Sequence, residues 1–176
     1  MSEKLPSREE ALIFLEKVGC SEEVINHCKA VAITALETAK KIQSKGISIN
    51  VQLVEIGALL HDIGRSKTHS VDHAIIGAYI VKKAGFPNSI ISIIKRHVGA
   101  GITATEAKKF GWKNDIYVPL TLEEKIVSYA DKLIEKSKIA PIENTINGLI
   151  RENKIEAAKR VQILYEEIHN LIDDAK

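Results

Sequence analysis

Several histidine and aspartate residues of this sequence interrupt apolar segments, where a polar side chain needs a partner. His61 and Asp62 are adjacent and follow the strongly apolar run 56–60. Asp131 has apolar residues one helical turn away on both sides. A buried carboxylate is costly unless it pairs with a cation or binds a metal. These residue types therefore indicate a metal-binding site.

Three further histidines, His27, His73 and His97, lie beside apolar residues at helical spacing. Each one alone has a simpler explanation as a hydrogen-bonded core residue, because a buried polar group needs only one partner. Together with the three residues above, however, they need a common explanation, and a metal provides one. Imidazole and carboxylate ligands suit one or two divalent ions of Mn, Fe, Co, Ni or Zn; Mg²⁺ is compatible but usually prefers more oxygen ligands.

Basic residues close to these histidines indicate a phosphate as substrate. Arg65 and Lys67 follow the His-Asp pair, and Arg96 precedes the last of the three histidines. Their side chains could hold the non-bridging oxygens of a phosphate, although each is equally well explained as a solvated surface charge. His69 precedes a predicted helix, where it could cap the helix or contact the substrate. The sequence has no glycine-rich phosphate loop of the P-loop NTPase kind.

Helices must position these residues, because apolar residues recur at helical spacing along the whole chain. Start and stop signals predict helices near residues 7–18, 21–45, 50–63, 70–84, 88–97, 103–110, 121–136, 143–152 and 155–174. Capping boxes are expected at Ser7–Glu10, Thr103–Glu106 and Thr121–Glu124, and glycine C-caps at Gly46, Gly64, Gly85 and Gly99. Segments 111–120 and 137–142 are predicted to be loops. With no convincing strand pattern, the predicted fold class is all-α.

Size and composition limit the class of protein. The 176 residues suffice for one domain with a substantial core, and 45% hydrophobic with 27% charged residues is typical of a soluble globular protein. A net charge of +2 argues against a nucleic-acid partner. Two cysteines without a C-x-x-C pair, a polar N-terminus and no long apolar run predict a cytoplasmic protein without a signal peptide or membrane span. The two C-terminal helices could cover the site, mediate a homodimer or complete the core.

The spaced residues His27, His61-Asp62 and Asp131 resemble the signature of the HD superfamily of metal-dependent phosphohydrolases. The letters HDIG at 61–64 are those of its HDIG variant. Segments 73–78, 93–101 and 120–133 are similar to stretches of the bacterial HDIG-type diadenosine tetraphosphate hydrolases. The resemblance implies a single HD-domain helical bundle over residues 1–176, with a core at about 21–136 and a C-terminal helical extension at 137–176. The segment KLIEKSKIAP after Asp131 departs from the acidic-proline-basic segment of those enzymes, which leaves the diadenosine substrate open.

The same resemblance implies two groups of metal ligands. His27, His61, Asp62 and Asp131 would bind the first ion, and His73 and His97 the second, with Asp62 bridging the two. The implied reaction is hydrolysis of a nucleotide phosphate ester or anhydride by a metal-activated hydroxide. His61 and Asp62 would be the catalytic residues, and Asp62 would orient or deprotonate the nucleophile.

Two alternatives remain, one within the enzymes and one outside them. The first is a phosphatase for nucleoside monophosphates with one metal ion, in which His73 and His97 contact the substrate. The second is a nucleotide-sensing or partner-binding domain whose metal is structural. Metal stoichiometry and turnover on phosphate esters distinguish these alternatives from the two-metal hydrolase.

Overall fold

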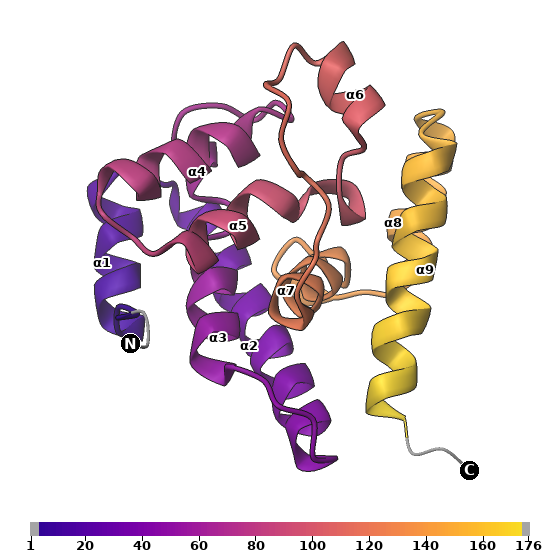
Figure 1. Cartoon of the computed structure of the whole chain (residues 1–176), viewed down its shortest axis with the longest axis horizontal. Coiled ribbons are helices and arrows are strands. Elements are labelled where there is room, and N and C mark those ends of the chain that lie inside the picture. The colour runs from indigo at the N-terminus through magenta and orange to yellow at the C-terminus, as the bar shows by residue number, and fades with distance from the viewer. Residues whose placement is uncertain (1–3, 174–176) are drawn as a thin grey trace.

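The computed structural model describes residues 4–173 and is built almost entirely of helices (Figure 1). The α-helices of this range are α1 Arg8–Lys17, α2 Glu22–Ser44, α3 Val51–Leu60, α4 His73–Lys83, α5 Asn88–Arg96, α6 Ala104–Lys109, α7 Leu122–Lys132, α8 Ile142–Arg151 and α9 Ile155–Ile172. Two 3₁₀ helices, η1 Ile63–Ser66 and η2 Val98–Ala100, follow α3 and α5. The predicted all-α fold is confirmed. Position 174, the predicted end of the last helix, lies outside the described residues.

The helix predicted to run to residue 136 ends at Lys132 instead, and a small hairpin follows it. Strands β1 Ile134–Glu135 and β2 Lys138–Ile139 pair antiparallel. The turn between them consists of Lys136 and Ser137, which have positive φ angles of 47° and 64°. The sequence pattern did not predict this hairpin, because the turn has none of the Gly, Asn or Asp residues that usually mark one.

The main core surrounds α3, whose residues from Ile56 to Leu60 are all buried. The apolar run 56–60 is thus buried throughout. Helices α2, α5 and α7 pack against it, and the buried face of α9 (Val161, Leu164 and Ile168) joins the same hydrophobic cluster. In Figure 1, α9 runs along the side of the bundle opposite α1. The C-terminal helix α9 therefore completes the core.

Gly64 does not act as the C-cap that the sequence pattern predicted. It lies inside η1, at the point where η1 packs on α4. A Cβ atom at Gly64 would collide with the carbonyl oxygen of His73 and lie 2.7 Å from the backbone nitrogen of Gly77. Gly64 is required for close packing, which fixes the start of α4 against the end of α3.

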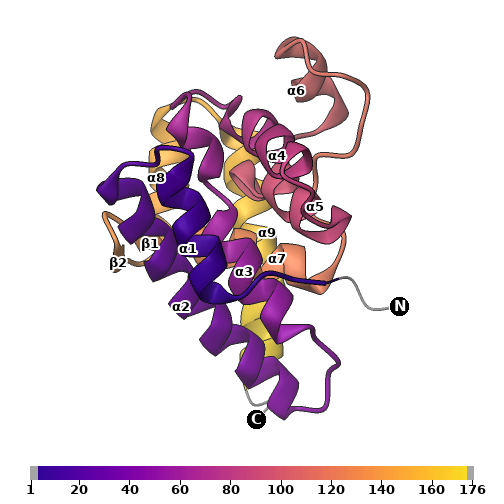
Figure 2. The same ribbon diagram turned by 90° about the vertical axis from the view of Figure 1, so that its left-hand side faces the viewer.

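Helix α6 and the loop after it project from the bundle, as Figure 2 shows. A second small cluster of buried residues (Ile102, Ala107 and Tyr117) supports this projection. Among the helices of residues 4–173, none has the length and apolar character to cross a lipid bilayer.

Candidate metal centre

The six predicted ligands meet at one place in the fold. His27 comes from α2, the His61-Asp62 pair from the end of α3, His73 from the start of α4, His97 from the end of α5 and Asp131 from α7. Ligand atoms of His27, His61 and Asp131 lie within 4.8 Å of one another, and so do those of His61, Asp62 and His97. Residues spread over 105 positions of the chain (27 to 131) thus share one centre.

His61 and Asp62 both face this centre, although adjacent residues of an α-helix diverge by about 100°. His61 keeps helical angles (φ −55°, ψ −37°), whereas Asp62 has left the helix (φ −100°, ψ 13°) before η1 begins. The end of α3 therefore falls between the two residues, and the change of backbone direction turns Asp62 toward the ring of His61.

Hydrogen bonds determine the tautomers of three rings. Nδ1 of His61, His73 and His97 each lies 2.7 Å from the backbone carbonyl oxygen three residues earlier. A carbonyl oxygen only accepts, so each Nδ1 carries a proton. When such a ring is neutral, its Nε2 carries a lone pair, and all three Nε2 atoms point toward the aspartates.

These nitrogens suit a metal ion. Nε2 of His73 and Nε2 of His97 lie 3.1 Å apart, a distance at which two lone pairs repel each other unless a positive charge lies beside them. Nε2 of the fully buried His61 has no hydrogen-bond partner among the described residues. Such a buried atom is costly. A divalent transition metal accepts this kind of nitrogen, and the Nδ1 bonds to carbonyls are the usual support for histidine ligands.

Asp62 divides its two carboxylate oxygens between two halves of the cluster. Its Oδ1 lies 3.1 Å from Nε2 of His73 and 3.4 Å from Nε2 of His97. Its Oδ2 lies 3.7 Å from Nε2 of His61 and 3.8 Å from Nε2 of His27. A carboxylate in this position can contribute one oxygen to each of two cation sites.

Both carboxylates remain ionised despite their burial. Burial alone would raise the pKa of Asp131, but the ammonium group of Lys132 and the neighbouring imidazoles hold this pKa well below its ordinary value. Burial also opposes ionisation of Asp62, but the charge of His61 and the nearby rings of His73 and His97 hold the pKa of Asp62 well below its ordinary value. Two negative charges are therefore present at neutral pH to bind a cation.

The buried rings differ in how they hold a proton. Burial lowers the pKa of His97 to about 4, so this ring is neutral at neutral pH. Burial acts against protonation of His61 as well, but the charge of Asp62 outweighs it and raises the pKa of His61 well above its ordinary value. The centre therefore favours a positive charge at Nε2 of His61, which either a proton or a metal ion can supply.

An open pocket of about 610 Å³ leads to one side of the centre. Its lining includes His27, Asp62 and Asp131. His73 and His97 do not line it and are 4% and 2% exposed, so they lie behind the residues that face solvent. The volume is in the range of about 300–1,000 Å³ typical of small-ligand sites.

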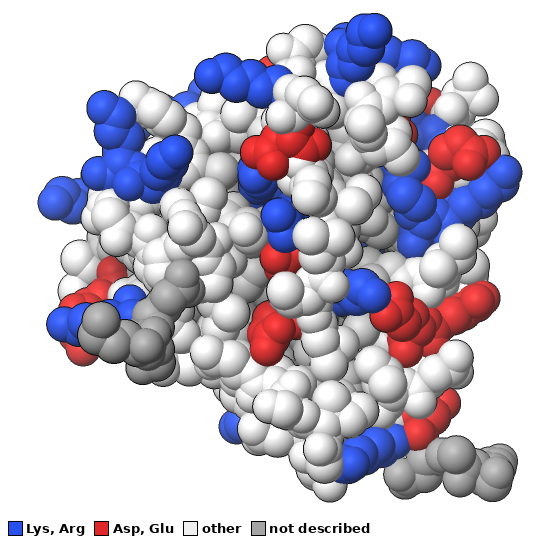
Figure 3. Space-filling model, viewed as in Figure 1, with Lys and Arg blue, Asp and Glu red and all other residues white. Residues whose placement is uncertain are grey.

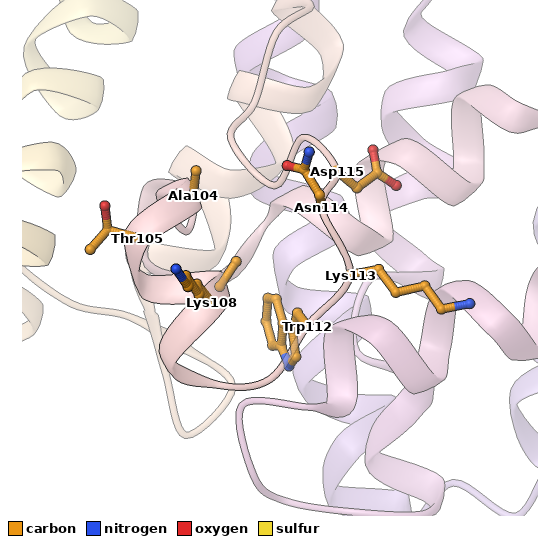
Figure 4. A pocket seen from close by; sticks show the side chains of 8 residues that line it. Ala104, Thr105, Lys108, Trp112, Lys113, Asn114 and Asp115 are labelled. Carbon is orange, nitrogen blue, oxygen red and sulfur yellow. The ribbon is translucent and has the colours of Figure 1, made fainter.

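A second hollow, of about 480 Å³, lies beside α6 (Figure 4). It is lined by Trp112 with Lys108 and Lys113 close by, and by none of the six ligands. Nε1 of Trp112 donates to Asp72 at 2.7 Å, which ties the projecting loop to the segment before α4. This hollow is separate from the metal centre.

Of the three predicted substrate-binding cations, only Arg65 lines the pocket. Its Nε donates to Oδ2 of Asp62 at 2.6 Å. Lys67 does not line the pocket, and its Nζ lies 3.4 Å from the carbonyl oxygen of Val18. His69, for which capping or substrate contact was expected, lines the pocket beside Arg65.

Arg96 is engaged elsewhere. Its Nη1 donates to both carboxylate oxygens of Glu124 at 2.8 and 3.0 Å, and its Nε donates to the carbonyl oxygen of Ile116 at 3.3 Å. The two side chains are only 13% and 5% exposed. Glu124 also accepts from the backbone N–H of Leu120, so it does not complete the capping box predicted with Thr121.

Arg96→Lys is expected to lower the free energy of unfolding by about 1–3 kcal/mol, because lysine keeps the charge but loses the guanidinium hydrogen bonds. Urea unfolding measures this change. The KM for any hydrolysed substrate should stay unchanged, since Arg96 does not face the pocket. A higher KM in a variant of normal stability would show instead that Arg96 contacts the substrate.

Several residues that line the pocket, Lys132, Lys136 and Ser137 among them, were not predicted from the sequence. Lys132 should point about 100° away from Asp131 on an ideal helix, yet its long side chain folds back and Nζ donates to Oδ2 of Asp131. Lys136 and Ser137 line the pocket from the hairpin turn. The only available signal for Lys132 was its place next to Asp131, and the turn carried no signal at all.

The family model described as the HD domain matches residues 24–135 of this chain. The chain belongs to the HD domain family. The matched span runs from α2 to β1 and contains all six candidate ligands. The superfamily that the sequence resembles is therefore confirmed.

Relatives of this HD domain protein carry different names. An uncharacterised protein of Methanocaldococcus jannaschii is 43% identical over 166 residues, which cover 93% of this chain and 98% of that protein. A tRNA (cytidine(56)-2′-O)-methyltransferase of Picrophilus torridus is 38% identical over 167 residues, 95% of this chain; the chain spans about half of that enzyme, 48%. The HD domain of the L. monocytogenes phosphodiesterase PgpH, solved with cyclic-di-AMP, has a TM-score of 0.57 at 21% identity and covers 93% of this chain and 98% of that one. This last likeness shows the fold alone.

Proposed function

We propose that this HD domain protein is a metal-dependent phosphohydrolase that cleaves a phosphate ester or anhydride bond of a nucleotide. The proposal rests on the buried Nε2 atoms of His61, His73 and His97, which point at two ionised aspartates. Such a donor set binds a divalent transition metal ion such as Mn, Fe, Co, Ni or Zn. The pocket in front of the centre gives a substrate access to it.

The ligands divide into two groups. His27, His61, Asp62 and Asp131 would hold one ion, and His73, His97 and the other oxygen of Asp62 would hold a second. The split of the Asp62 oxygens between the two groups supports two ions rather than one. In the alternative with a single ion, His73 and His97 contact the substrate, and their burial behind the pocket weighs against it.

When bound, the metal supplies Lewis acidity and lowers the pKa of water at the centre. The side chains of the pocket prepare it for an anion. Arg65 pairs with Asp62 and Lys132 with Asp131, so the charges of both carboxylates are already balanced. A bound metal ion would therefore give the pocket a net positive charge, which attracts a phosphate. His61 is held by its Nδ1 hydrogen bond, and ionised Asp62 can accept a hydrogen bond from the attacking water. These two residues form the proposed catalytic pair.

The relatives narrow the class of substrate. One solved neighbour is a phosphodiesterase bound to cyclic-di-AMP, and one relative is named for tRNA. Both names refer to nucleotides joined by phosphodiester bonds. We therefore propose such nucleotides as the first class to screen, ahead of the diadenosine polyphosphates that the HDIG letters suggest.

The charge distribution of one face of the molecule bears on nucleic-acid binding at that face. On the face shown in Figure 3, basic and acidic side chains are interspersed. A long nucleic acid is usually bound along a continuous basic surface, which this face does not present. This face is therefore not suited to a long nucleic acid.

Metal content and turnover of one preparation test the proposal. Protein purified without chelator is expected to contain about two ions per chain and to hydrolyse bis(p-nitrophenyl) phosphate. Removal of the metal with a chelator should abolish turnover, and Mn, Fe, Co, Ni or Zn should restore it. One ion per chain with turnover would favour the single-metal phosphatase. A tightly held ion without turnover on a panel of phosphate esters would favour a partner-binding domain with a structural metal.

A further inference from the structure

The hairpin beside the pocket contains a strained turn. Ile134 pairs with Ile139 and Glu135 with Lys138, which leaves Lys136 and Ser137 as a two-residue turn. Both have positive φ angles, 47° and 64°, a conformation that suits Gly or Asn and is unfavourable for other residues. Strain that persists at the mouth of a binding pocket points to a function of the residues that carry it.

Lys136 brings a cation without a counter-charge to this pocket. Arg65 is paired with Asp62 and Lys132 with Asp131. Lys136 forms no ion pair with any residue of the described range 4–173, yet it lines the same pocket.

Two carboxylates outside the centre, Glu23 and Glu135, also line this pocket. Glu135 accepts a hydrogen bond from Nδ2 of Asn144 at 3.1 Å. The start of the hairpin is attached to α8, because Oγ1 of Thr145 donates to the carbonyl oxygen of Lys132 at 2.8 Å. Lys136 is thus the cation of the pocket that remains available to a ligand.

We propose that Lys136 and Ser137 form a subsite for a second phosphate of the substrate, beyond the phosphate that lies at the metal centre. This inference rests on the proposed function. Lys136 supplies an ammonium group and Ser137 a hydroxyl donor, and the turn holds both at the pocket. The substrate is therefore a nucleotide with at least two phosphate groups. The second one is either a further phosphate ester of an oligonucleotide or part of a nucleoside diphosphate.

The test measures binding rather than turnover. A dinucleotide with a phosphorothioate link, which resists hydrolysis, is prepared without a terminal phosphate, with a 5′-phosphate and with a 3′-phosphate. Non-hydrolysable analogues of AMP and ADP, with a methylene group in place of the ester or bridging oxygen, form a second matched set. Calorimetry on the metal-loaded protein should show that an added phosphate tightens binding by about five- to tenfold in one of the two sets, as expected for a charge-assisted contact. The set in which binding tightens shows whether the second phosphate is a phosphate ester of an oligonucleotide or part of a nucleoside diphosphate.

Lys136→Ala should lose that gain, and Lys136→Arg should keep it. Lys138→Ala is the matched control, because Lys138 lies on the same hairpin, is exposed and does not line the pocket; it should behave as the wild type. The inference is overturned if no added phosphate tightens binding, or if the gain survives in Lys136→Ala. If the subsite exists but the proposed function is wrong, the second phosphate would still tighten binding, but the protein would hydrolyse no phosphate ester.

A second variant tests the strain. The double change Lys136→Asn with Ser137→Gly provides the residues that this turn geometry favours. It should raise the melting temperature by about 2–4 °C and lose the gain from the second phosphate. A rise in melting temperature with full retention of the gain would show that the turn does not bind the phosphate.

Discussion

Asp62→Ala protein is expected to contain no bound metal and to show no hydrolysis, while its far-UV circular dichroism stays helical. Asp62 places one oxygen near His73 and His97 and the other near His61 and His27, so its removal takes a ligand from both proposed ions. Turnover should fall by at least about 10³-fold, since the nucleophile depends on the metal. Elemental analysis and a phosphodiester assay measure the two effects.

Two comparisons make this result specific. His97→Ala removes a ligand of the second ion only, so its metal content should fall by about half rather than to zero. Asp115→Ala removes an exposed carboxylate that pairs with Lys95 outside the centre, and it should keep both metal and turnover. Hydrolysis at the wild-type rate in Asp62→Ala would contradict the assignment of the centre.

Gly64→Ala is expected to destabilise the protein by about 3 kcal/mol or more, because the added methyl group has no space. Its Cβ would collide with the carbonyl oxygen of His73 and approach the backbone nitrogen of Gly77 to 2.7 Å. Both obstacles are backbone atoms, which cannot rotate away, so α4 must shift as a whole. Because His73 is the first residue of α4, the shift should also weaken binding of the second ion. Urea unfolding and metal analysis of the folded variant measure the two consequences.

Gly148→Ala is the matched control. Gly148 lies inside α8, and a Cβ there would meet no atom within 4 Å. The substitution should stabilise the protein by about 0.5–1 kcal/mol, because alanine is the better helix former. Equal stability of Gly64→Ala and the wild type would show that η1 and α4 are not held in contact through these glycines.

The sequence by itself determined the helical elements and the identity of the clustered residues. Each of the six candidate ligands lies among apolar residues at helical spacing, and this pattern depends only on the local sequence. The positions of the helices could be predicted for the same reason, since capping residues such as Ser7, Ser21 and Asn50 act on adjacent backbone. Local signals of this kind do not depend on how distant segments pack.

Only the tertiary structure decided which neighbours these residues meet. From the sequence, Lys67 and Arg96 were as suitable for phosphate binding as Arg65. The partner of a long side chain depends on which residues pack beside it, and Arg96 donates to Glu124 instead. The pairing of Lys132 with Asp131 and the left-handed turn at Lys136 likewise depend on long-range contacts. The division of the two carboxylate oxygens of Asp62 between His61 and His73 also depends on such contacts. The centre exists because elements distant in sequence pack together, and spacing along the chain carries no information about that contact.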